Sequence, residues 1–298
     1  MSEAATDSAL LPPGLLSRLD RLALVARKKH RGGAAGERRS KRRGQSVEFA
    51  DYRDYVQGDD TRHLDWNLFA RLEHLYLKLF EEQEELTLNV LVDGSQSMAF
   101  GTPSKADFAR RLAAALGYIA LVGYDRAHVE WWSEAGAALG PLQGKAQARK
   151  LFAFLEAASC GGATDLEGAA RRFALRRGAR GIVVLISDLF DEQGPDAALR
   201  RLQQLRAETY VVQVLAPEEI DPNLSGDLKL VDSETGAHAE ISVTPALLRR
   251  YEQNRDAFLE QMRQACVRRG AQHLVVSSDT PMERLTLDIL RRGGLLRN

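Results

Sequence analysis

One apolar segment restricts the folds open to this chain more than any other feature. Ile182-Val-Val-Leu-Ile186 has no polar residue over its whole length, which is typical of a strand covered on both faces by helices. Similar strands are indicated at 86–93 and 209–215, and an amphipathic helix capped by Ser104 follows the first of them. Alternating buried strands and helices predict an α/β fold with a doubly wound, mainly parallel sheet flanked by helices.

The sheet domain is expected to span residues 83–298, and its other elements follow from hydrophobic periodicity and turn residues. Further strands are expected at 127–132, 135–139 and 274–277, a hairpin at 228–231 and 238–243, and helices at 145–158, 165–177, 199–205, 245–269 and 281–291. The order of these elements keeps strands and helices in alternation along most of the domain, as a doubly wound sheet requires.

Two segments precede this domain. Residues 1–43 are expected to form a short helix and then a basic arm at 27–43, which has nine Lys or Arg and one Glu and therefore a net charge of +8. Residues 44–82 mix aromatic and charged residues irregularly and end in an edge strand near 75–80. Because the arm lacks aromatic residues for base stacking, nucleic acid is not an expected partner.

Charge and cysteine content narrow the class of protein. The formal net charge is zero, so no overall field attracts nucleic acid or a membrane surface. Cys160 and Cys266 fit no metal-ligand spacing and no disulfide framework, which favours a reducing compartment. No apolar run approaches the ~18 residues of a membrane span, and the first residues do not resemble a signal peptide. We therefore expect a cytoplasmic protein that does not enter a membrane.

Oxygen-bearing side chains follow the predicted strands where ligands bind in doubly wound sheets, beyond the strand carboxyl ends. The segment Asp93-Gly-Ser95-Gln-Ser97 follows one strand, Thr164 precedes a helix, and Asp188 follows the apolar run. Because every donor is an oxygen, we expect Mg²⁺, with Mn²⁺ as a substitute, rather than Zn²⁺. Neutral hydroxyl ligands would leave the metal electron-poor, which favours an incoming carboxylate.

These five residues resemble the metal-ion-dependent adhesion site of von Willebrand factor type A domains. By that resemblance Ser95, Ser97 and Thr164 would coordinate the metal directly or nearly so, while Asp93 and Asp188 would act directly or through water. In that family a partner's acidic side chain often completes the metal shell. Each residue alone is also a common turn or capping residue, so the prediction depends on the five-part match.

A second pattern runs from residue 44 to residue 93. It consists of Gly44-Gln-Ser46-Val-Glu48-Phe49, Arg53-Asp-Tyr55, Gly58-Asp59-Asp60-x-Arg62-x-Leu-Asp65-Trp66, Ala70-Arg71, Lys78-x-Phe80 and Leu91-Val-Asp93-x-Ser95. This pattern resembles the bacterial proteins of domain of unknown function family 58. Members of that family are typically encoded beside AAA+ ATPases of the MoxR type, so the resemblance implies such an ATPase, and its client, as partners.

The charged residues of this second pattern have two interpretations. Asp59, Asp60 and Asp65 with Arg53, Arg62 and Arg71 can form an ion-pair network that braces the segment. Alternatively, four of the charged residues form a docking surface for a partner, namely Asp59, Asp60, Arg62 and Asp65. Trp66 is interpreted as a core residue.

Taken together, these patterns predict a non-enzymatic, metal-dependent protein-binding module, an adaptor or co-chaperone for a MoxR-type AAA+ ATPase. The alternative is an Mg²⁺-dependent phosphoryl-transfer hydrolase with Asp93 as nucleophile. That enzyme needs a second acid where Ser95 stands and a positioned lysine, and the nearest lysine, Lys105, lies at a predicted helix start. No histidine or cysteine has a catalytic or metal-binding spacing.

Overall fold

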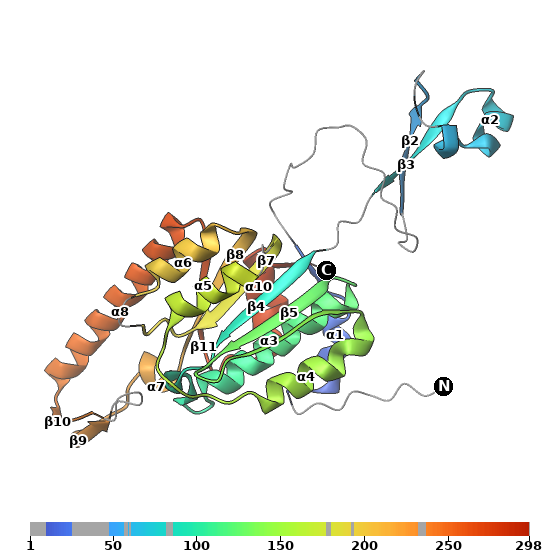
Figure 1. The fold of residues 1–298 in the computed structure, drawn as a ribbon. Helices are drawn as coiled ribbons and strands as arrows, with labels where there is room; N and C mark the ends of the chain where they lie inside the picture. Colours follow the sequence, from blue (N-terminus) through green and yellow to red (C-terminus); the bar gives the residue numbers. More distant parts are fainter. Residues whose placement is uncertain are drawn as a thin grey trace. The chain divides into compact units, whose positions relative to one another are not determined.

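The computed structural model describes residues 10–25, 48–56, 59, 61–81, 86–176, 180–191, 194–231 and 237–297. The chain divides into two compact units, residues 1–29 with 86–298, and residues 30–85 (Figure 1). The basic arm predicted at 27–43 lies outside the described residues.

The larger unit is built on a six-stranded sheet with the order β11-β8-β7-β4-β5-β6. Its strands are β4 (Thr87–Asp93), β5 (Arg126–Trp132), β6 (Ala137–Gln143), β7 (Arg180–Ser187), β8 (Arg206–Leu215) and β11 (Gln272–Ser277). All neighbouring pairs are parallel except β5 with β6, which places one antiparallel strand at an edge. The predicted α/β class with a doubly wound, mainly parallel sheet is confirmed.

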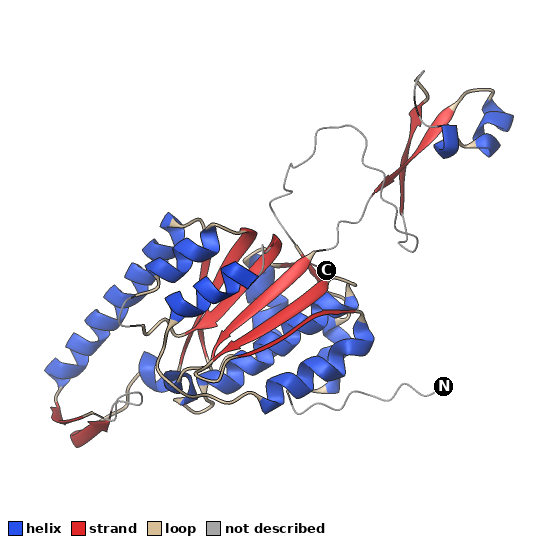
Figure 2. Ribbon diagram, in the orientation of Figure 1, coloured by secondary structure: helices blue, strands red, loops and turns tan. Residues whose placement is uncertain are grey.

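Helices cover both faces of this sheet (Figure 2). One face packs against α1 (Pro13–Leu19), α3 (Lys105–Val122) and α4 (Ala148–Ala157), and the other against α5 (Leu166–Arg176), α6 (Asp196–Gln203) and α8 (Pro245–Arg268). In β7, Ile182, Val184 and Ile186 enter the first core, whereas Val183 and Leu185 enter the second. The unbroken apolar run thus reflects a strand buried on both sides.

Short elements complete the larger unit. The hairpin of β9 (Gly226–Val231) and β10 (His238–Val243) is found where it is predicted, and α7 (Pro217–Ile220) precedes it. The C-terminal segment contains α9 (Met282–Arg284), a π-helical turn (Leu285–Ile289), α10 (Leu290–Arg292) and β12 (Leu296–Arg297). Among the described residues, none of the helices combines the length and the apolar character that crossing a membrane requires.

The start of the chain differs from the predicted division into domains. The division puts residues 1–43 outside the sheet domain, but Leu15 and Leu19 of α1 are buried in its core. The strand β1 (Ala23–Leu24) pairs with β12 near the opposite end of the chain. The first helix therefore belongs to the larger unit, because its apolar stripe is buried there.

The smaller unit consists of β2 (Glu48–Asp54), η1 (Thr61–His63), α2 (Trp66–Leu72) and β3 (Tyr76–Glu81). The predicted edge strand near 75–80 is found as β3, but it pairs with β2 and not with the main sheet. The interpretation of Trp66 as a core residue is wrong, since its side chain is 62% exposed and contacts Phe69 edge-on. Trp66 begins a short helix, where Asp65 caps the helix and is itself buried.

The charged residues of the smaller unit have mainly local contacts. Arg53 Nη2 lies 2.9 Å from Asp59 Oδ1, which is one ion pair of the predicted network. Asp65 Oδ1 accepts hydrogen bonds from the backbone of Asn67 and Leu68, and Tyr52 donates to Asp65 Oδ2. Arg62 is exposed, and Asp60 lies outside the described residues. These contacts give Asp59 and Asp65 a bracing role; docking by this group stays a prediction.

Candidate functional site

The candidate site lies where the connections of the sheet diverge. The strands β4 and β7 are neighbours, but the chain continues from β4 to β5 and from β7 to β8, in opposite directions along the sheet. Such a switch point leaves a crevice at the strand carboxyl ends, where ligands bind in doubly wound folds. Asp93 is the last residue of β4 and Asp188 follows β7 directly, so the topology brings both carboxylates to this switch point.

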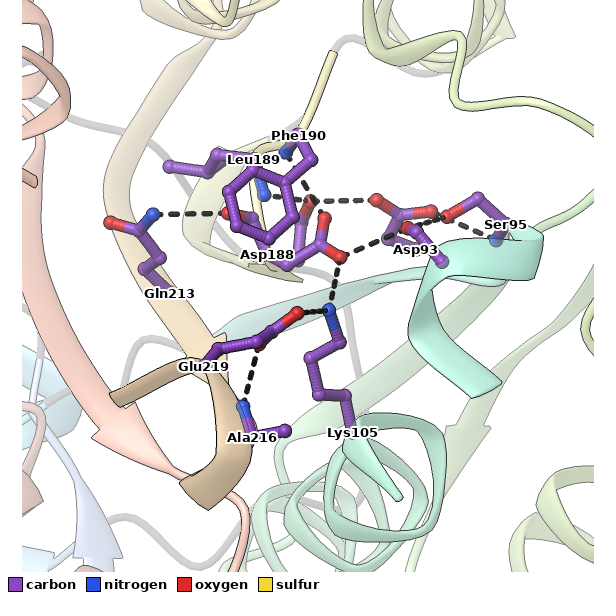
Figure 3. Close-up of polar contacts among 11 residues, drawn as sticks. Asp93, Ser95, Lys105, Asp188, Leu189, Phe190, Gln213, Ala216 and Glu219 are labelled. Atoms are coloured by element: carbon purple, nitrogen blue, oxygen red, sulfur yellow. Dashed lines mark hydrogen bonds and ion pairs between the residues drawn. The ribbon is translucent and has the colours of Figure 1, made fainter. Parts of the chain in front are cut away.

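Four of the five predicted residues are joined by hydrogen bonds at this position, and Figure 3 labels Asp93, Ser95 and Asp188 among them. The backbone N–H of Ser95 donates to Asp93 Oδ1 at 3.0 Å, and the Ser95 and Ser97 hydroxyl oxygens are 3.0 Å apart. The Ser97 hydroxyl donates to Asp188 Oδ2 at 2.9 Å, so it accepts from Ser95. The serines are thus positioned between the two carboxylates.

The fifth predicted residue, Thr164, lies in a loop that is bonded to the same segment. The backbone N–H of Gly161 donates to Gly94 O at 2.9 Å, and Gln96 N–H donates to Gly162 O at 3.0 Å. Thr164 follows two residues later and is partly buried. These backbone bonds bring the Thr164 loop against the segment that contains Ser95 and Ser97.

The two aspartates are buried close to each other, and this affects their ionisation. Asp93 and Asp188 are 2% and 0% exposed. Burial and the nearby Asp188 charge raise the pKa of Asp93 to about 6, although the Ser187 hydroxyl donates to Asp93 Oδ2 at 2.6 Å. Asp188 Oδ1 accepts the backbone N–H of Phe190 at 3.1 Å. Each carboxylate therefore has protein donors on both of its oxygens.

Lys105 contacts the candidate site, and the sequence interpretation misses this contact. Its side chain is 1% exposed, and Nζ lies 2.7 Å from both Asp188 Oδ2 and Glu219 Oε1. Burial alone would lower the pKa of Lys105, but the charges of the two carboxylates outweigh burial and raise it. A lysine in the first turn has the wrong sign for the helix dipole, and this is the sequence signal that points to a specific partner.

Glu219 connects the site with the helices that follow β8. It lies in α7, and its Oε2 accepts the backbone N–H of Ala216 at 2.7 Å. The Tyr251 hydroxyl in α8 donates to Glu219 O at 2.7 Å, and Arg255 Nη1 donates to Ile220 O. The Lys105 contact is therefore supported by α8 as well as by α7.

The backbone beside Asp188 is held in an uncommon conformation. Leu189 has φ +63° and is fully buried, and such a conformation is sterically unfavourable for a leucine. The side chain of Gln213 donates to Asp188 O at 3.0 Å, and Gln213 Oε1 lies 3.0 Å from His273 Nε2. These contacts fix the turn after β7 and so the position of the carboxylate.

The sheet has the doubly wound, mainly parallel strand order that the sequence predicts. A family model described as "Protein of unknown function DUF58" matches residues 51–261, and the chain belongs to this family. This agrees with the pattern of residues 44–93.

Several relatives and solved structures resemble the chain. It is 29% identical over 265 residues to uncharacterized proteins of Mycobacterium tuberculosis (Rv1480) and Mycobacterium bovis (Mb1516), covering 83% of each chain. The conserved hypothetical protein BatB of Bacteroides thetaiotaomicron has a TM-score of 0.45 at 16% identity, over 70% of this chain and 98% of BatB. The SpRpn10 VWA domain has a TM-score of 0.37 at 9% identity, over 67% of this chain and 92% of that domain.

Proposed function

We propose that the chain is a non-enzymatic protein-binding module that holds Mg²⁺, or Mn²⁺ as a substitute, and uses it to bind a carboxylate of a protein partner. The metal ligands in this proposal are Asp93, Ser95, Ser97, Thr164 and Asp188. The observation that carries it is the hydrogen-bonded series from Asp93 through both serines to Asp188 at the switch point of the sheet. Oxygen donors alone suit a hard divalent cation.

The charges around this series fit a divalent cation. When ionised, Asp93, Asp188 and Glu219 contribute three negative charges and Lys105 one positive charge, which leaves a net charge of −2. Uncompensated buried charge is costly, and a divalent cation would balance it. No group of three or more His, Cys, Asp or Glu suited to a metal occurs in the described part of the chain, so the hydroxyls of the series are essential to this proposal.

The partner in this proposal is a MoxR-type AAA+ ATPase in the cytoplasm, together with its client, and the chain acts as adaptor or co-chaperone. Membership of the DUF58 family supports this choice, because members of that family, which the pattern at residues 44–93 resembles, are typically encoded beside MoxR-type ATPases. The bound metal would supply one open position to an acidic side chain of the partner. The five ligand residues would hold the cation, and the bond from Ser97 to Asp188 orients the serine hydroxyls.

One observation favours the hydrolase alternative. Lys105 is a positioned lysine that donates to Asp188, the carboxylate directly after β7. However, Lys105 is already paired with two carboxylates, and residue 95 is Ser instead of the second acid that a phosphoryl-transfer site needs. Incubation with p-nitrophenyl phosphate and Mg²⁺ tests this alternative. We expect no turnover above that of an Asp93→Ala variant.

The metal is tested by titrating the chain with Mn²⁺ in a calorimeter. We expect one site in the unmodified chain, and Asp93→Ala should weaken Mn²⁺ binding about 10–100-fold, the usual effect of losing a ligand or its support. Asp107→Ala is the matched control, since Asp107 is an exposed carboxylate in the first turn of α3, and its loss should leave the affinity unchanged.

Partner binding is tested with a purified MoxR-type ATPase from the same organism in Mg²⁺ and in EDTA. The proposal expects EDTA and Asp93→Ala to weaken the complex to a similar extent. Equal Mn²⁺ affinity in the folded Asp93→Ala variant, or a complex that withstands chelation, would contradict the proposal.

A further inference from the structure

Two half-exposed phenylalanine rings stand beside the candidate metal site. Phe100 lies in the loop after β4, and Phe190 follows Asp188 by two residues in the loop after β7. Their side chains are 50% and 42% exposed, and their ring centroids lie 5.9 and 5.1 Å from the buried Lys105 Nζ. We call Phe100 and Phe190 together the phenylalanine rim.

Hydrogen bonds hold the backbone of both rim residues at the site, and a ring contact holds the Phe190 side chain. Phe100 N–H donates to Ser97 O at 3.2 Å, and Phe100 O accepts the N–H of Lys105 at 3.0 Å. Phe190 N–H donates to Asp188 Oδ1, and the Phe190 ring stacks on Phe258 of α8 with centroids 5.1 Å apart. Rigid aromatic side chains lose little conformational entropy when a partner covers them.

The rim is also at a suitable distance for the neighbour of a metal-bound residue. Lys105 Nζ lies 2.7 Å from Asp188 Oδ2 and 5.1 Å from the Phe190 ring centroid. An extended chain advances about 3.3 Å per residue. A residue one or two positions from the metal-bound acid would therefore reach the ring.

We propose that the phenylalanine rim binds an apolar side chain next to the acidic residue of the partner, so that the site selects an extended segment in which Asp or Glu is flanked by Leu, Ile or Phe. This proposal rests on the proposed function, because the metal binds the acidic residue. Charge does not oppose such a segment, because the proposed divalent cation would balance the net charge of −2 at the site, the nearby Glu219 carboxylate is bonded to Lys105 and Ala216, and the rim itself has no charge. Aromatic residues around a specific polar contact are typical of interface hot spots.

The test compares three fluorescein-labelled eight-residue peptides by anisotropy in Mg²⁺ and in EDTA. One has a single aspartate flanked by leucines, the second has serines in place of the leucines, and the third has asparagine in place of the aspartate. Burying one leucine contributes about 1.5–3 kcal/mol, so the first peptide should bind at least about 10-fold more tightly than the second. Because this comparison uses the unmodified chain, it does not depend on the folding of a variant.

The Phe100→Ser/Phe190→Ser double variant should lose the preference for leucine and keep its Mn²⁺ affinity. Leu175→Ser/Val267→Ser is the matched control, because it also removes two exposed apolar side chains, which are 82% and 61% exposed on α5 and α8. The control should keep the preference. If the double variant keeps it too, the rim proposal is overturned.

The outcomes separate this proposal from the proposed function. Equal, metal-dependent binding of the leucine and serine peptides overturns the rim proposal and leaves the proposed function in place. A leucine preference that survives EDTA overturns the proposed function and supports the rim as an apolar docking surface. Self-association of the chain that the double variant abolishes would assign the rim to a second copy, which also overturns the proposal.

Discussion

Replacing Lys105 with methionine is expected to lower the free energy of unfolding by about 3–5 kcal/mol, the usual effect of removing one partner of a buried ion pair. The variant leaves Asp188 and Glu219 without the ammonium group that both contact at 2.7 Å. Methionine has a similar length but supplies no hydrogen-bond donor. Urea unfolding followed by circular dichroism measures the change.

The matched control is Lys145→Met, which makes the same substitution at an exposed ion pair. Lys145 pairs with Asp20 at 3.0 Å, and the two side chains are 55% and 36% exposed. Exposed pairs contribute about 0–1 kcal/mol, so this variant should change stability little. Similar losses in the two variants would show that burial of the Lys105 cluster does not determine its contribution.

The Lys105→Met variant also bears on the proposed metal. Without the ammonium group, the site has one more uncompensated negative charge, so Mg²⁺ should stabilise the variant more than the unmodified chain. Urea unfolding of the variant and of the unmodified chain, each in Mg²⁺ and in EDTA, gives the stabilisation by Mg²⁺ in each protein. If Mg²⁺ raised the free energy of unfolding of the variant no more than that of the unmodified chain, the result would contradict a divalent cation beside Asp188.

The Gly94→Ala variant is expected to lose about 3 kcal/mol of stability, because it combines overpacking with a broken buried hydrogen bond. A Cβ at residue 94 would lie 2.2 Å from Trp131 Nε1 and 2.6 Å from Trp131 Cδ1. The indole is 1% exposed, and its Nε1 donates to Ser159 O at 2.8 Å, so a displaced ring would lose this hydrogen bond. Near-ultraviolet circular dichroism should detect the displaced ring, and urea unfolding measures the loss of stability.

Gly161→Ala is the control for this substitution. Gly161 donates its N–H to Gly94 O, yet a Cβ there would meet no atom within 4 Å and its φ is not in the left-handed region. Its stability should stay within about 0.5 kcal/mol of the unmodified chain. A Gly94→Ala variant as stable as this control would mean that the indole adapts without loss.

The parts of the fold that sequence predicts best are those where local pattern and burial agree. The run at 182–186 predicts a strand buried on both faces, and β7 is such a strand. Ser104 is predicted to cap a helix, and its Oγ accepts the N–H of Asp107 at 3.1 Å. The position of Asp93 and Asp188 at one edge follows from a rule about parallel sheets and needs no knowledge of side-chain packing.

The parts that sequence does not predict depend on contacts between distant segments. Lys105 and Glu219 are far apart in the chain, and nothing local indicates that α7 brings the carboxylate to the ammonium group. The strand β3 has the alternation of any half-buried strand, and this pattern does not distinguish pairing with β2 from pairing with the main sheet. Trp66 is exposed because it begins a helix whose residues include none that is buried.

The antiparallel strand β6 has a consequence for how the sheet meets other molecules. Pro141 lies within β6, at the edge of the sheet, and a proline has no N–H to donate to a further strand. An incoming strand could therefore not complete a regular ladder along β6. Natural sheets use such prolines against unwanted edge-to-edge aggregation. Pro141 thus disfavours association of the larger unit with its own copies through β6.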